Sequence, residues 1–327
     1  MTSVAAGSTR LFSDLDVEVE ADAPLGPRTW FGVGGRADAL VHPRSEEALA
    51  TLVARCHRDG IPLRVLGEGA NLLVADEGVA GVVVRLDAPC FRERRLNARG
   101  AVEGVRLMGG ADLARSVLET TRAGFAGLEG LAGIPASIGG AVRMNAGGAF
   151  GSIGDRLHAV ACLDRRGEVV VAPAASLNLG YRHCELPGEI VLWASFTLGE
   201  GDPVRLRAGV AEVFAYKRST QPLAEHSAGC MFRNPRDEEV SEEVRAAFGH
   251  TPSAGALVDR AGLKGFAHGG ACVSPQHGNF VVVRPGATAD DILAVSRTVA
   301  ERVADRFGVR LEREVVVWTR TPPEAGR

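Results

Sequence analysis

The chain has 327 residues, of which 46% are apolar and 24% charged, which is ordinary usage for a globular protein of two or three domains. Its net charge of −3 argues against a nucleic-acid-binding protein, because such proteins carry a basic surplus or stripe. No apolar stretch approaches the roughly 18 residues of a membrane span, and residues 1–10 lack the basic and apolar regions of a signal peptide.

We expect both ends of the chain, residues 1–10 and 321–327, to be disordered. Residues 1–86 read as a small α+β unit. Residues 28–40 predict a strand, a turn at 32–35 and a second strand. Ser45 then caps a helix, and strands follow at 63–66 and 81–86. The apolar face of this helix consists of Leu49, Leu52, Val53 and Cys56.

Residues 87–200 read as a second α+β unit. The pattern predicts a strand at 102–107 and a helix at 112–122 whose inward side chains are Leu113, Val117 and Leu118. Three further strands are expected, at 159–163, 169–171 and 190–198.

A third unit is expected over residues 201–310. Pro203 opens a helix that runs to Lys217, and a helix near 255–261 and a strand at 279–283 follow. A long helix then begins with a capping box, Thr288 with Asp291, and stops at Gly308. Residues 311–327 are expected to be a strand at 311–318 and a tail.

Two glycine-rich segments stand out. Residues 130–148 read GLAGIPASIGGAVRMNAGG, which we expect to form neither a packed helix nor a plain strand, because glycine loses backbone entropy and buries nothing. Such a segment can bring main-chain N–H groups close to an anion; the alternative is a set of tight turns. Residues 67–73 read GEGANLL, which lacks the third glycine of a dinucleotide fingerprint and continues as a strand. Together the two segments indicate a diphosphate held between two small sheets.

Three residues are candidates for chemistry, each with a plainer alternative. Arg182 follows Tyr181 between two strands and alone would read as a solvated arginine. Cys230 lies on a tight small-residue loop, where it either contacts a substrate or is a buried structural cysteine. Glu314 adjoins an apolar run and is either an edge-strand surface residue or a site residue with a perturbed pKa.

The six cysteines are scattered and form no CxxC pair, so we expect no zinc or dithiol site and a reducing cytoplasm. We expect four or five of them to be buried as small hydrophobes. They are Cys56, Cys90, Cys162, Cys184, Cys230 and Cys272.

Taken in order, nine segments resemble one family, the UDP-N-acetylenolpyruvoylglucosamine reductases (MurB) of peptidoglycan synthesis. Any one of them is weak, but nine in the right order over nearly the whole chain are specific. They are TWFGVGG at 29–35, LGEGANLL at 66–73, GIPASIGGAVRMNAG at 133–147, Tyr181-Arg182, QPL at 221–223, SAGCMFRNP at 227–235, AGLKG at 261–265, HGNF at 277–280 and LEREV at 311–315.

The resemblance implies an α+β protein with an FAD-binding fold of the vanillyl-alcohol-oxidase type. Two α+β subdomains, residues 1–86 and 87–200, would hold FAD, and a third domain, 201–310, would bind substrate, with Glu314 on the segment 311–327. By carry-over, the FAD-binding positions are Gly67, Gly69, Ala70, Asn71, Leu72, Gly133, Ile134, Pro135, Ser137, Gly139, Gly140, Asn145, Ala146 and Gly147.

The implied reaction passes hydride from NADPH to FAD and then to C3 of UDP-N-acetylglucosamine enolpyruvate, giving UDP-N-acetylmuramate. Arg182 and Glu314 would face the negative charge that develops, and Cys230 would give the proton to C2, where many members have serine. A free thiol has a pKa of about 8.5, so it can serve as the acid. The short stretch after Arg182 indicates the type without the tyrosine-bearing loop.

The implied partner is this small-molecule substrate, with no nucleic acid or membrane, and the implied state is a cytoplasmic monomer. Two alternatives stay open: an alcohol or sugar oxidase of the same fold that uses O2, and a non-catalytic nucleotide-binding protein. Anaerobic reduction by NADPH separates the first from the reductase, and a flavin spectrum argues against the second. The candidates for contact with the UDP-sugar are Tyr181, Lys217, Gln221, Arg233, Asn234 and Lys264.

Overall fold

The structure, a computed structural model, describes residues 11–96 and 104–321. It divides into two compact units, each built from separate stretches of chain. The first comprises Met1–Ala23, Ala37–Glu68 and Ala80–Tyr216, and the second Pro24–Arg36, Gly69–Val79 and Lys217–Arg327. The assignment of 1–86 and 87–200 to FAD and of 201–310 to substrate stays a prediction.

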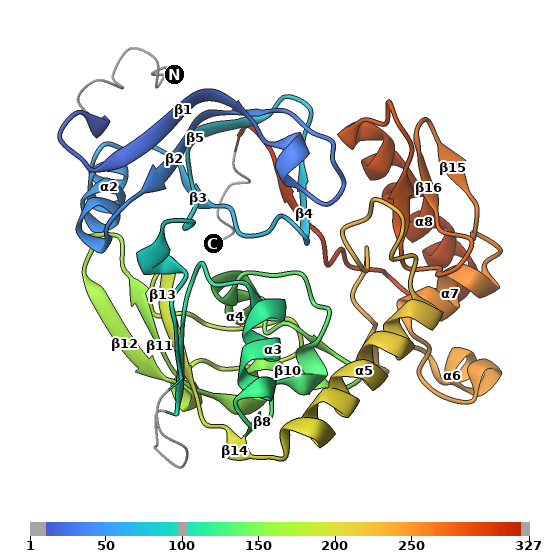
Figure 1. Ribbon diagram of the computed structural model, residues 1–327. Helices are drawn as coiled ribbons and strands as arrows, with labels where there is room; N and C mark the ends of the chain where they lie inside the picture. The colour runs from blue at the N-terminus through green and yellow to red at the C-terminus, as the bar shows by residue number, and fades with distance from the viewer. Residues whose placement is uncertain (1–10, 97–103, 322–327) are drawn as a thin grey trace. The chain divides into compact units, whose positions relative to one another are not determined.

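One sheet of the first unit has the order β1-β2-β5-β3 (Figure 1). Helix α2 (Glu46–Arg58) lies next to it, and the predicted cap is confirmed, since Ser45 Oγ accepts from the Ala48 N–H at 3.1 Å. The first predicted strand is wrong: residues 26–28 form a 3₁₀ turn with Pro27 near its start, where a missing N–H is tolerated. The strands are β1 (Val17–Pro24), β2 (Arg36–Pro43), β3 (Leu63–Val65) and β5 (Val79–Val84).

The second sheet of this unit has the order β12-β11-β13-β7-β6 and is buried on both faces at its centre. In β11, Val160 and Cys162 pack into one core cluster, while Ala161 and Leu163 pack into another. Double burial explains why its central strands read as nearly continuous apolar runs. The strands are β6 (Arg94–Leu96), β7 (Val105–Met108), β11 (Leu157–Leu163), β12 (Val169–Pro173) and β13 (Ile190–Phe196); the expected start of β7 at Val102 lies outside the described residues.

Helix α3 (Leu113–Arg122) begins as predicted, because the Asp112 carboxylate accepts from the Arg115 N–H at 2.6 Å. The inward assignment of Leu118 is wrong, since that side chain is 38% exposed. Ser116 and Thr120 are buried instead, and each hydroxyl donates to a main-chain carbonyl of the preceding turn. Their hydroxyls are thus satisfied inside the core, which a pattern of apolar residues cannot reveal.

The rest of the first unit is short structure and one long helix. Its minor elements are η2 (Pro89–Phe91), β8 (Phe125–Ala126), η3 (Glu129–Leu131), α4 (Ile138–Arg143), β9 (Gly147–Gly148), β10 (Gly151–Ser152), η4 (Ile153–Arg156), η5 (Ala174–Ser176), β14 (Gly199–Glu200) and the start of α5 (Pro203–Thr220).

The second unit has a core between α7, α8 and a three-stranded sheet, β15-β16-β17 (Figure 1). The predicted ends of α8 are confirmed: Thr288 and Asp291 form the capping box, and Gly308 ends the helix with φ 68°. Of the predicted strand at 311–318, only Val316–Trp318 is a strand, β18, which pairs in parallel with β4. The other elements are η1 (Gly26–Arg28), β4 (Leu72–Val74), η6 (Asp237–Glu239), α6 (Glu242–Phe248), α7 (Ala254–Arg260), β15 (Ala267–His268), β16 (Ala271–Val273), β17 (Val281–Val283) and α8 (Ala289–Phe307).

Three cysteines are buried, fewer than expected: Cys56, Cys162 and Cys272. The other three are half-buried, because they lie on turns and loop ends. In the part of the chain that the structure describes, we find no helix long and apolar enough to cross a membrane.

Candidate active site

A cavity lined by glycine and charged side chains opens in the first unit. Its walls are the segments 65–68 after β3, 85–87 after β5, 109–110 after β7, 137–143 around α4, and 189–191 at the start of β13. Of the predicted FAD-binding residues, it brings together Gly67, Ser137, Gly139 and Gly140.

Glycine is required here because the walls approach closely. A Cβ on Gly67 would lie 2.7 Å from Ser137 Oγ, and one on Gly109 or Gly110 would collide with a main-chain carbonyl. Ser137 Oγ has a second task, since it caps α4 by accepting from the Gly140 N–H at 3.2 Å. The glycines therefore keep open a space that side chains would fill.

The expectation that residues 130–148 contain no helix is wrong, because α4 lies within them. Ile138, Ala141 and Val142 pack into the core, while Gly139 and Gly140 line the cavity. The Ile138 and Gly139 N–H groups donate to the carbonyls of Ala111 and Gly109, at 2.9 and 2.8 Å. The main-chain N–H groups at this turn are thus used inside the protein, and the predicted N–H cradle must be corrected at these positions.

Positive charge reaches the cavity from side chains instead. Arg85, Arg92 and Arg143 line it, together with Glu68, Asp87 and Glu189. Guanidinium groups bind phosphate oxygens with two parallel hydrogen bonds. A glycine-lined cavity with three arginines fits the diphosphate of a dinucleotide.

Asn145 connects the glycine-rich segment to the turn that carries Arg182. Its side chain donates from Nδ2 to the Gly180 carbonyl at 2.8 Å and accepts at Oδ1 from the Gly154 N–H at 3.0 Å. Gly180 and His183 exchange two main-chain hydrogen bonds of 3.1 Å, and Arg182 between them has φ 55°. A left-handed arginine is uncommon and is retained where the surroundings fix it, which is typical of functional sites.

The neighbouring candidates shape this region. The Arg182 guanidinium lies 5.2 Å from the centre of the exposed Tyr181 ring. Gly133 turns the chain with φ 69°, and the Ala146 N–H donates to the Ala141 carbonyl at 2.8 Å. The remaining positions of this set, Ile134, Pro135 and Gly147, lie on the same segment, with Gly147 in β9.

In the second unit, Asn279 holds the segment that carries Cys230. The buried Asn279 accepts from the Phe232 N–H at 2.9 Å and donates to the Phe232 carbonyl at 2.8 Å. Its own carbonyl accepts from the Met231 N–H at 2.7 Å. Gly229, with φ 78°, turns the chain just before Cys230, which is half-buried. Cys230 therefore lies at the start of a segment whose main chain is held by hydrogen bonds to Asn279.

Glu314 lies beside the same segment. Its N–H donates to the Met231 carbonyl at 2.8 Å, and Phe232 pairs with Arg313 as an isolated bridge. The Glu314 carbonyl accepts from Asn71 Nδ2 at 3.2 Å. The structure thus brings Cys230, Glu314 and Asn71 to one region of the second unit, and Glu314 is half-buried there.

The second glycine-rich turn also belongs to this unit. Gly69 has φ 65°, and a Cβ there would collide with the Arg28 carbonyl. Its own carbonyl accepts from the Trp30 N–H at 3.0 Å. Ala70 completes the turn, and Leu72 begins β4, paired with Val316. These contacts make Gly69 a structural requirement of the turn.

The candidates for substrate binding are basic or amide side chains with different surroundings. Burial lowers the pKa of Lys217 to about 8, and Lys264 Nζ pairs with Asp259 at 2.7 Å. Among the described residues, the buried Nε of Arg233 has no partner, while Nη1 lies 3.9 Å from Glu312.

The two amide residues also contact main chain, Asn234 through its side chain and Gln221 through its backbone N–H. Asn234 Oδ1 accepts from the Ala254 N–H at 3.1 Å, and the Gln221 N–H donates to the Lys217 carbonyl at 2.9 Å.

Sequence reasoning missed Asn279 and the three arginines of the cavity. Asn279 is part of the quoted HGNF segment, but a lone asparagine gives no sign of which strand it will bind. The arginines come from three separate stretches that only the fold brings to one cavity.

Two family models match separate parts of the chain. A family model of the FAD binding domain matches residues 37–172. A model of the C-terminal domain of UDP-N-acetylenolpyruvoylglucosamine reductase matches residues 221–318.

Similar proteins extend over almost the whole chain. A UDP-N-acetylenolpyruvoylglucosamine reductase of Desulfosudis oleivorans is 40% identical over 319 residues, covering 94% of this chain and 96% of the relative. One of Heliobacterium modesticaldum is 39% identical over 311 residues, covering 94% and 93%. The crystal structure of the Thermus caldophilus reductase (MurB) matches with a TM-score of 0.74 and 38% identity. The match covers 93% of this chain and 99% of that one.

These matches confirm the predicted α+β architecture with an FAD-binding fold of the vanillyl-alcohol-oxidase type. They also agree with the geometry, because the matched FAD-binding region contains every wall of the glycine-lined cavity except residues 189–191, and the matched C-terminal region contains Cys230. The chain belongs to the UDP-N-acetylenolpyruvoylglucosamine reductase family, whose members are FAD-dependent oxidoreductases of peptidoglycan synthesis.

Proposed function

We propose that this enzyme reduces UDP-N-acetylglucosamine enolpyruvate to UDP-N-acetylmuramate, with NADPH as the reductant and Cys230 as the proton donor. The observation that carries the proposal is the set of main-chain hydrogen bonds on the segment that follows Cys230. Asn279 bonds to Met231 and Phe232, and the Glu314 N–H donates to the Met231 carbonyl. We further propose that it acts as a monomer in the cytoplasm, where its six free thiols stay reduced.

The cavity residues are proposed to hold FAD. Gly67, Gly139 and Gly140 leave room for its diphosphate, and the arginines of the wall neutralise the charge. When bound there, FAD would supply C3 of the substrate's vinyl group with the hydride that NADPH provides.

The reduction is complete when C2 takes a proton, so that the carbon–carbon double bond has gained one hydride and one proton. A general acid must stand within hydrogen-bond reach of the atom that it protonates. Cys230 meets the chemical requirement, because an S–H group is a donor and its loop has few side chains in the way.

Negative charge develops on C2 and the neighbouring carboxylate before the proton arrives. Fixed cations and donors aimed at that charge lower the barrier. We assign this work to Arg182, whose left-handed backbone is fixed by the Asn145-held turn, and to Glu314, which can donate only when protonated.

We assign UDP-sugar binding to Tyr181, Lys217, Gln221, Arg233, Asn234 and Lys264, as predicted. The unpartnered Arg233 Nε supports this assignment, because a buried donor without a partner costs free energy that a ligand can recover. The short link from His183 to β13 supports the type without a tyrosine-bearing loop.

Replacement of Cys230 tests the proposal. We expect Cys230→Ser to keep substantial turnover, because a hydroxyl can occupy the same place. Cys230→Ala should lose about 10²–10⁴-fold, while anaerobic flavin reduction by NADPH stays normal in both variants. Cys90→Ala is the matched control, since Cys90 is half-buried in the first unit and bonds only to the Arg44 carbonyl among the contacts described. Near-normal turnover of Cys230→Ala would show that the proton comes from elsewhere.

A further inference from the structure

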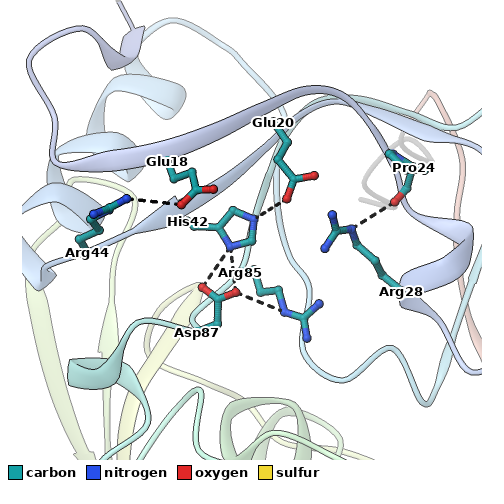
Figure 2. Close-up of polar contacts among 8 residues, drawn as sticks. All are labelled: Glu18, Glu20, Pro24, Arg28, His42, Arg44, Arg85 and Asp87. Atoms are coloured by element: carbon teal, nitrogen blue, oxygen red, sulfur yellow. Dashed lines mark hydrogen bonds and ion pairs between the residues drawn. The ribbon is translucent and has the colours of Figure 1, made fainter.

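In the first unit, the His42 ring lies between two carboxylates, those of Glu20 and Asp87 (Figure 2). Asp87 also lines the cavity. His42 Nδ1 lies 3.0 and 2.9 Å from the two oxygens of Asp87, and His42 Nε2 lies 3.2 Å from Glu20 Oε1. Arg85 Nε is 3.7 Å from Asp87 Oδ2. Asp87 and Arg85 both line the cavity, whereas His42 stands behind them on β2.

We propose that Asp87, held in position by His42, binds the adenosine end of FAD and makes this cavity select FAD over FMN. The inference rests on the proposed function only in taking FAD as the cofactor. Asp87 would contact the cofactor, and His42 would act as a positioning residue.

The chemistry of a carboxylate limits what it can bind. An ionised carboxylate accepts about four hydrogen bonds and donates none, and His42 uses only part of that capacity. It repels phosphate oxygens and binds neutral donors. In a flavin dinucleotide, the donors beyond the diphosphate are the ribose hydroxyls and the amino group of adenine.

The place of the cavity favours the adenosine end over the ribityl chain. The lining of the cavity contains neither Tyr181 nor Arg182, the residues of this unit that we assign to substrate chemistry. It does contain the arginines suited to the diphosphate, with Arg143 also donating to the Glu189 carbonyl. The end of the dinucleotide remote from the reacting ring therefore fits this wall.

His42 gives Asp87 a fixed direction. Its ring is only 15% exposed, and it is held from the other side by Glu20, so it cannot turn without losing both carboxylates. A carboxylate fixed in advance loses little side-chain entropy when it binds. Removal of His42 should thus weaken adenosine binding, although His42 itself makes no contact with the ligand in this proposal.

Flavin binding to the apo-protein, followed by quenching of flavin fluorescence, tests this. For Asp87→Ala we expect the Kd for FAD to rise about 10–100-fold, the effect of losing hydrogen bonds to a charged acceptor, while the Kd for FMN stays within about 2-fold. His42→Ala should raise the Kd for FAD by a smaller factor and also leave FMN unchanged. AMP should compete with FAD for wild type more strongly than for Asp87→Ala.

Glu18→Gln is the matched control, because Glu18 pairs with Arg44 at 3.4 Å on the same sheet but does not line the cavity. Equal weakening of FAD and FMN would mean that the network only supports the fold, and unchanged FAD binding would mean that Asp87 makes no contact; either result overturns the inference. Failure of wild type to bind any flavin would instead refute the proposed function.

Discussion

The buried amide of Asn279 offers the sharpest test of how the Cys230 segment is held. Asn279 is 3% exposed, and its side chain makes two hydrogen bonds to Phe232, which is itself 2% exposed. Asn279→Ala leaves both main-chain groups of Phe232 without these partners. The variant thus removes the clamp and leaves the thiol untouched.

The size of the effect follows from those two groups. Each buried main-chain group left unsatisfied costs about 1–3 kcal/mol, which sets a range of about 2–6 kcal/mol. Water can enter the space of the missing amide and bond to part of them, so we expect the free energy of unfolding of the second unit to fall by about 2–4 kcal/mol. Turnover should fall as well, because Cys230 adjoins the loosened segment.

Urea denaturation followed by tryptophan fluorescence measures this loss, since Trp30 and Trp318 both belong to the second unit. Hydrogen exchange of peptides covering 227–235 gives the local readout and should accelerate. Gln276→Ala is the control, because Gln276 is exposed three residues away and should shift stability by no more than about 0.5 kcal/mol. A stable Asn279→Ala with unchanged exchange at 227–235 would refute the reasoning.

Three further predictions concern caps, glycines and pH. Thr288→Ala should lower the free energy of unfolding by about 1 kcal/mol, because the capping box of α8 is lost; thermal denaturation against Thr321→Ala measures it. Gly67→Ala should destabilise the wild type but much less a Ser137→Ala background, because its Cβ would lie 2.7 Å from Ser137 Oγ; a double-mutant cycle that shows additivity contradicts this. Binding of UDP should take up a proton near pH 9 and weaken as the pH rises above about 8, because the pKa of Lys217, about 8 without ligand, rises beside a diphosphate. Calorimetry in buffers of different ionisation enthalpy measures the proton uptake, and Lys217→Met should abolish it.

The parts of the fold that the sequence predicts well are those decided by neighbours in the chain. Ser45 and Thr288 each cap the helix expected of them, because a cap needs only a side chain two or three positions before an N–H group. Gly308 ends α8 in the left-handed conformation for the same local reason.

The missed elements had weaker patterns or a different source of stability. In β1, Glu18 and Glu20 interrupt the valines, and their partners Arg44 and His42 lie more than twenty residues away. Helix α6 has a Ser241 cap and a Gly249 stop, but it has no fully buried residue and thus no apolar stripe to find. Both β1 and α6 depend on contacts with residues far away in the chain, which a short stretch of sequence does not contain.

The candidate site shows the same limit. Residue types and motif order identified Arg182, Cys230 and Glu314, and those assignments stay predictions. How the residues are held could not be derived, because Asn145 reaches Gly180 over 35 positions and Asn279 reaches Phe232 over 47. Long-range hydrogen bonds of single amides leave no periodic trace in a sequence.

The glycine-rich segment shows why composition can indicate a site and still misjudge its chemistry. The sequence suggested that Gly139 and Gly140 supply N–H donors, but the Gly139 N–H is used by Gly109 and that of Gly140 by Ser137. Gly139 matters instead for its missing Cβ, which would lie 3.1 Å from the Gly109 carbonyl oxygen. Recognition of the charge is proposed to come from the arginines that line the cavity, Arg85, Arg92 and Arg143. If this division holds, Arg143→Gln should weaken FAD binding more than Gly140→Ala, because the alanine Cβ would meet only Ser137 Oγ, at 3.2 Å, and a shift of that side chain by a few tenths of an ångström relieves the contact. Flavin content after purification measures both losses. A larger loss from Gly140→Ala would show that main-chain N–H groups, and not the arginines, dominate binding of the diphosphate.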